Sequence, residues 1–145
     1  MYPTACCETK PTSATPSNRF YGDTAGDRLA ALLKDHILIA AAVVSAAKAG
    51  DKSALESAQK RWSENATDLA LFLSDANPHW KRATLNPMLQ MHLELLTRQI
   101  VARPNQDWAG DVRAYGEGVA HMMMFADVLT EGLIRQFPDK LGGVR

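Results

Sequence analysis

Breaks at glycine and proline divide residues 24–136 into four long segments in which apolar residues recur every three or four positions. The breaks fall at Gly50, at Asn77–Pro78 and at Pro104. A spacing of three and four is typical of helices that bury one face, and no segment shows the alternation of a half-buried strand. The sequence therefore predicts an all-α fold with helices at about 24–49, 53–75, 87–103 and 107–136.

Local signals mark the expected ends of these helices. Thr24 and Ser53 each open a short motif, "TAGD" and "SALE", in which an acidic residue follows the cap by three positions. Asn86 precedes Pro87, and proline is favoured at the first position of a helix. Gly50 suits the position just after a helix end, because glycine adopts the left-handed conformation without strain.

The short connections favour an antiparallel, up-down four-helix bundle in a single domain at 23–145. Residues 1–22 contain several Pro, Ser and Thr residues, and we expect them to form a flexible tail. The only cysteines, Cys6 and Cys7, are adjacent within this tail. No disulfide can therefore link parts of the core, and we interpret the pair as free thiols.

The charge pattern excludes some partners. Sixteen basic and sixteen acidic residues give a net charge of zero, without a basic stripe, which argues against nucleic acid and anionic membranes. We find no signal peptide and expect no membrane-spanning run, because the longest apolar stretch, 37–47, is short and contains a serine. These features predict a cytoplasmic protein.

Three of the four apolar faces carry a polar residue near their middle: His36, Asn65 and His92. Since neighbouring helices run antiparallel, these positions fall at similar heights, within about one turn of roughly 5 Å. The candidate site is the layer that this geometry predicts, with three further positions drawn from the second and fourth helices. Its members are His36, Trp62, Asn65, His92, Tyr115 and Met122.

A buried imidazole or amide costs a few kcal/mol unless it finds a partner. The layer could be a hydrogen-bonded core network, a small-ligand pocket with Trp62 as its wall, or a metal site in which His36 and His92 are ligands. We favour a non-enzymatic protein that binds a small ligand or metal, of unknown identity. The alternatives are a structural or interaction protein and, less favoured, an enzyme that uses His36 or His92 as general base.

A second apolar surface is expected on the last helix. If Tyr115 and Met122 face the core, a flank of small and apolar residues lies outside and would pack against another subunit or the tail. We therefore expect a homo-oligomer. The flank consists of Ala114, Gly118, His121, Phe125, Val128 and Gly132.

Several stretches together resemble a family of small bacterial all-helical proteins, common in spore-formers, with no established activity. They are "FYG" (20–22), "LLKDHILIAAAVVSAAKAGD" (32–51), "RWSENATDLALFLSDANPHW" (61–80), "MLQMHLELL" (88–96), "VAR" (101–103) and "FADVLTEGLIRQFP" (125–138). Some members carry the names glycosyltransferase or acetylglutamate kinase, which we take to be mistaken. The resemblance implies a helical bundle and covers His36, Trp62, Asn65, Asn77, Trp80 and His92. Relatives have a further helical segment before "FYG", which this chain replaces with the Pro/Ser/Thr tail.

Overall fold

The computed structural model describes residues 18–141, and within that range the chain is all-α, without strands. Four long helices dominate the fold, and two single-turn helices stand at its ends. In chain order the helices are α1 (Asn18–Tyr21), α2 (Asp23–Ala49), α3 (Lys52–Ala76), α4 (Arg82–Ala102), α5 (Trp108–Gln136) and α6 (Pro138–Leu141).

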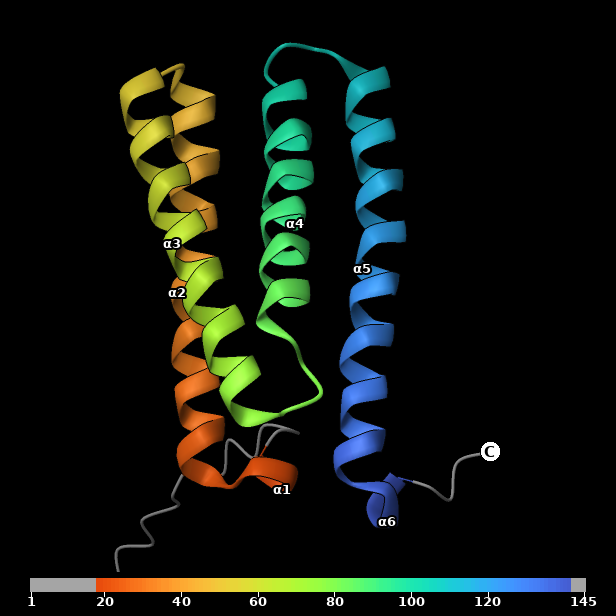
Figure 1. Ribbon diagram of the computed structural model, residues 1–145. Helices are drawn as coiled ribbons and strands as arrows, with labels where there is room; N and C mark the ends of the chain where they lie inside the picture. Colours follow the sequence, from red (N-terminus) through yellow and green to blue (C-terminus); the bar gives the residue numbers. More distant parts are fainter. Residues whose placement is uncertain (1–17, 142–145) are drawn as a thin grey trace, which may run out of the picture.

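The long helices alternate in direction and stand side by side in the order α3, α4 and α5, with α2 largely behind α3 (Figure 1). Each packs mainly against its neighbour in the chain: α2 on α3, α3 on α4 and α4 on α5. The backbones of α2 and α5 do not pack closely against each other.

The core is formed by apolar faces of α2, α3 and α4, together with Phe125 of α5 and Trp80 of the α3–α4 loop. Val43, Trp62, Leu69 and Leu89 are all buried, as the helical periodicity predicted. Leu33, at the edge of the apolar face of α2, is 45% exposed. At roughly 1.5–3 kcal/mol for each fully buried large apolar side chain, this cluster is a main source of the fold's stability.

Helix ends agree with the sequence in two places and differ in four. α2 begins at Asp23, with Gly22 in the cap position and no side-chain cap bond, so Thr24 lies within the first turn and is not the cap. Gly50 ends α2 with a φ of 67°, and Asp107 caps α5 by accepting from the Gly110 amide at 2.8 Å. At the start of α3 the cap is Asp51, which accepts from the Ala54 amide, rather than Ser53. α3 therefore begins earlier than expected: its cap lies two positions before Ser53, and Ser53 is already in the first turn.

The other two differences lengthen the ordered helical structure. α4 begins at Arg82, so Pro87 lies within its second turn instead of at its start. Residues 18–21 form α1, inside the stretch expected to be a tail, while Cys6 and Cys7 lie outside the described residues. Tyr21 of α1 is bonded to α5, so the folded domain begins before residue 23.

The orientation of α5 is opposite to our expectation. The flank expected outside supplies the buried residues Ala114, His121, Phe125 and Gly132, whereas Gly118 and Val128 are partly buried. The face expected inside is exposed at Trp108, Val112, Tyr115, Val119 and Met122. Both faces of α5 are apolar, so hydrophobicity alone does not indicate which face is buried. The buried face is determined by close packing, because Trp80 lies directly against Gly132.

One helix of the described range, α2, has the length and apolar composition that crossing a membrane requires. Core helices and signal sequences pass the same test, so the evidence for a span is weak. We had expected no such stretch. Most of the apolar window of α2 is not buried in the protein, so α2 exposes an apolar side.

Candidate functional site

His36 of α2 and Asn65 of α3 are directly bonded. The Nδ1 of His36 lies 2.8 Å from the Oδ1 of Asn65, and the Nδ2 of Asn65 donates to the backbone oxygen of Leu32 at 3.1 Å. Asn65 is buried, with 7% of its surface exposed. The predicted neighbourhood of these two side chains is confirmed.

This pair of bonds determines the tautomer of neutral His36. The Asn65 amide nitrogen must face the Leu32 carbonyl, since its oxygen there would meet another acceptor. The Asn65 oxygen therefore faces His36, and the Nδ1–H of the ring must donate to it. The lone pair of neutral His36 is consequently at Nε2, which is left to accept a proton or coordinate an ion.

His92 of α4 lies beside this pair. Its ring is nearly parallel to that of His36, with 6.2 Å between the centroids and 14° between the planes. Within residues 18–141 His92 makes no hydrogen bond, so its ring is not fixed as that of His36 is. Burial, and secondly the nearby His36 and His121, lower the pKa of His92 below its ordinary 6.5, so the ring is neutral at pH 7.

Trp62 completes the inner side of the layer. Its ring lies 5.4 Å from that of His36, and only 1% of its surface is exposed. The indole Nε1 is buried and finds no partner among the described residues. Trp62 is therefore an enclosed core residue rather than the wall of an open pocket.

We had expected Tyr115 and Met122 inside the layer, but they lie outside it. Because α5 presents its other face to the core, they are 60% and 38% exposed. They line one wall of a groove of about 290 Å³ between α4 and α5, where His92 lies on the opposite wall. The structure thus unites His36, Trp62, Asn65 and His92 and places Tyr115 and Met122 at the outer edge beside His92.

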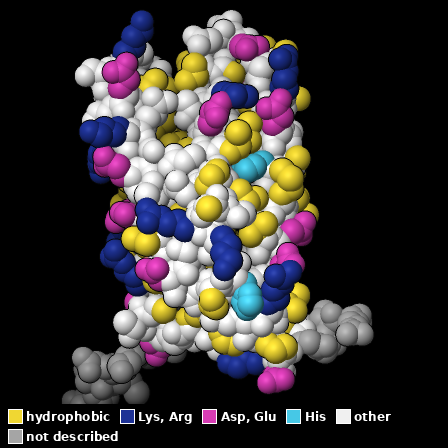
Figure 2. Space-filling view, in the orientation of Figure 1, with side chains coloured by type: hydrophobic (Ala, Val, Ile, Leu, Met, Phe, Trp, Pro, Cys, Tyr) yellow, Lys and Arg dark blue, Asp and Glu magenta, His cyan; other side chains and the backbone are white. Residues whose placement is uncertain are grey.

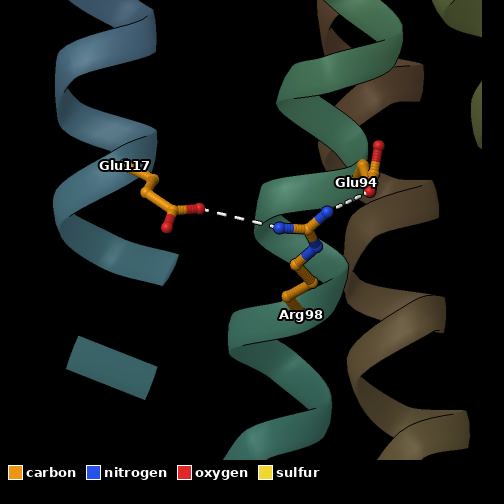
Figure 3. A network of polar contacts seen from close by, with 3 residues as sticks. All are labelled: Glu94, Arg98 and Glu117. Carbon is orange, nitrogen blue, oxygen red and sulfur yellow. Dashed lines mark hydrogen bonds and ion pairs between the residues drawn. The ribbon is translucent and has the colours of Figure 1, made fainter. Parts of the chain in front are cut away.

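His121 and Glu117, one turn apart on α5, have different partners on α4. His121 is buried, and its Nε2 lies 2.7 Å from the backbone oxygen of Met88, to which it donates. Arg98 of α4 instead bridges Glu94 on its own helix and Glu117 on α5, the latter at 3.6 Å (Figure 3). These side chains are about half exposed, so the ion pairs contribute little stability.

A polar cluster at the α1 end was not anticipated from the sequence. The hydroxyl of Tyr21 donates to the Oε1 of Gln136 at 2.7 Å and accepts from the Nδ2 of Asn77 at 3.1 Å. Asn77 is fully buried, and its Oδ1 accepts from the His79 amide. The "NPHW" stretch had indicated only a helix break, although the family resemblance includes Asn77 and Trp80. This cluster joins α1, the α3–α4 loop and α5.

Comparison of the chain with protein-family models, curated proteins and solved structures finds no match. The resemblance to the helical bacterial family therefore stays a prediction. Any function for this chain has to be argued from the side chains of the layer themselves.

Proposed function

We propose that the protein is a helical-bundle protein that binds a transition-metal ion through His36 and His92, with the remaining coordination positions open to water or a small ligand. The observation that carries the proposal is the bond between His36 and Asn65. A metal-binding histidine usually donates its other ring nitrogen to a fixed acceptor, which sets the tautomer and orients the ring. Asn65 supplies such an acceptor in a buried position.

The second imidazole has the required protonation state and position. His92 is kept neutral at pH 7 by its lowered pKa, and a neutral imidazole is the form that binds Zn²⁺, Cu²⁺ or Ni²⁺. Two imidazoles on one ion at 2.0–2.1 Å place their ring centroids roughly 5–6.5 Å apart. The 6.2 Å between His36 and His92 falls in this range.

One ring must turn for both lone pairs to meet an ion, because the two planes are nearly parallel. His92 is the ring that can turn, since it has no hydrogen bond within residues 18–141. The groove beside it gives access from the space between α4 and α5. Within the described residues no third His, Cys, Asp or Glu joins the pair, so we expect weak binding with an open coordination sphere.

Zinc titration of the full chain tests this proposal. Because Cys6 and Cys7 could bind Zn²⁺ themselves, calorimetry is best done in the Cys6→Ser/Cys7→Ser chain. We expect one Zn²⁺ per chain, and at least tenfold weaker binding in His36→Ala and in His92→Ala. Asn65→Ala should weaken binding by roughly tenfold through loss of ring orientation. His79→Ala is the matched control, because His79 is an exposed histidine in the α3–α4 loop.

Stoichiometric binding that survives both His36→Ala and His92→Ala, or no binding at all, would contradict the metal site.

The second candidate function then applies: the layer fixes the register of the four helices of an up-down bundle. The observation that favours it is that the His36–Asn65–Leu32 chain of bonds already joins α2 to α3 without any ligand. In that case a well-packed apolar pair should replace His36 and Asn65 without loss of stability.

A further inference from the structure

α2 and α5 each expose a row of apolar side chains. On α2, Leu33, Ile37 and Val44 follow one another at helical spacing and are 45%, 68% and 38% exposed. α5 exposes Tyr115 and Val119 at 60% and 47%, in a row that starts at Trp108. In the view of Figure 2, apolar side chains are exposed over α5 between the charged ones.

The two rows belong to one continuous surface across α4. Gln99 of α4 lines a groove with Val44 of α2, and it also lines the groove with Tyr115 and Val119 of α5. The apolar side chains of both rows are exposed, so nothing in the described chain covers this surface. We call it the α2–α5 face. Its large exposed apolar side chains are Leu33, Ile37, Val44, Trp108, Val112, Tyr115, Val119, Met122 and Met123.

The α2–α5 face is an extended apolar surface. Its nine large side chains are 38–70% exposed. Single exposed apolar side chains are ordinary on a monomer, but an extended set of this kind marks an interaction surface.

We propose that the α2–α5 face is the contact between two copies of this chain in an isologous dimer. A single copy exposes the whole face, and a second copy offers an equally large surface of matching apolar chemistry, bordered by Lys48 and Arg103 near Val44. Residues 1–17 are a poor occupant, because their Pro, Ser and Thr residues provide no helical apolar row. An anionic bilayer is also a poor occupant of this face, because a chain with a net charge of zero has no excess of basic residues to attract anionic lipids. The inference does not depend on the metal site.

Sedimentation equilibrium of the full chain between about 1 and 100 μM tests the dimer. We expect a mass close to twice the 15.9 kDa of one chain. Ile37→Glu on α2 and Val119→Glu on α5 each introduce a charge that is buried twice in a symmetric contact, so each should raise Kd at least about 100-fold. Both positions are exposed in the single chain, so its fold should persist by circular dichroism.

The matched controls are Leu38→Glu and Met124→Glu, at positions 58% and 55% exposed on other sides of the same helices. Both should leave the dimer intact. A monomer throughout this concentration range would overturn the proposal, as would a dimer that survives Ile37→Glu and Val119→Glu. A monomer that sediments with vesicles of phosphatidylcholine and phosphatidylglycerol would assign the face to a membrane instead, and would equally overturn it.

Discussion

Trp80 lies so close to Gly132 that a methyl group at residue 132 would be 2.0 Å from the indole Nε1. The same Nε1 donates to the backbone oxygen of Leu129 at 3.1 Å, one turn earlier on α5. The α3–α4 loop is thereby held against the last turns of α5. Both the missing Cβ and the hydrogen bond require this face of α5 to point inward.

Gly132→Ala should therefore destabilise the protein strongly, although alanine is the better helix former. Displacing a buried indole costs about 1–3 kcal/mol, or roughly 5–10 °C in Tm for a domain of this size. Thermal unfolding followed by circular dichroism measures the change. Gly116→Ala is the matched control, because nothing lies within 4 Å of a Cβ there, and it should raise stability by roughly 0.5–1 kcal/mol. Equal effects in the two variants would contradict the packing.

A double-mutant cycle on His36 and Asn65 tests whether the two side chains act as a pair. Asn65→Leu leaves the His36 Nδ1–H without its acceptor and should cost about 1–3 kcal/mol. His36→Leu leaves the Asn65 oxygen unpaired in the core, at a similar cost. The double variant should cost less than the two single variants together by about 1 kcal/mol or more, as urea unfolding would show. Additive costs would mean that the bond does not form in solution.

Local signals made much of the fold predictable. Helical periodicity and the breaks at Gly50 and Pro104 depend on residues close together in the chain, and the four long helices were found from them. The neighbourhood of His36, Asn65 and His92 followed from one further assumption, that successive helices alternate in direction. The spacing of residues along the chain was therefore enough to predict the long helices and the neighbourhood of these three side chains.

Features set by distant contacts could not be predicted in the same way. Because α5 is apolar on both sides, its rotation depends on Gly132 fitting against Trp80, 52 residues away, and on His121 reaching the Met88 oxygen. Likewise the bond from Tyr21 to Gln136 joins residues 115 positions apart. With the rotation of α5 reversed, Tyr115 and Met122 were placed in the core and the α2–α5 face was missed.

The lowered pKa of His92 predicts a loss of stability in mild acid. Above pH 6.5 the ring is neutral in both folded and unfolded chains, so it adds no pH dependence there. As the pH falls below 6.5 the unfolded chain binds a proton that the folded protein resists, and the free energy of unfolding decreases by at most about 1.4 kcal/mol per pH unit. Urea unfolding at pH 7.5 and 5.5 should show a smaller decrease in His92→Gln than in the unmodified chain. An equal decrease in both would contradict the assignment to His92.

The hydroxyl of Tyr21 should stabilise the α1 end through the two bonds it makes. Tyr21→Phe removes the donor to Gln136 and leaves the Nδ2 of the fully buried Asn77 without this partner, at a cost of about 1–3 kcal/mol. Tyr115→Phe is the matched control: that side chain is 60% exposed, and its change should stay within about 0.5 kcal/mol. Urea unfolding of the two variants measures the difference.

Alkaline titration gives a second readout of the same contact. Burial, outweighing the hydrogen bond from Asn77, raises the pKa of Tyr21 above its ordinary 10.0. Above pH 10 the unfolded chain therefore loses the phenolic proton more readily than the folded protein, and the ring contributes a loss of stability that grows with pH. Tyr21→Phe should lose less stability than the unmodified chain between pH 9 and 11. A Tyr21→Phe variant as stable as the unmodified chain at pH 7, with the same alkaline profile, would show that α1 is not held to α5 by this hydroxyl.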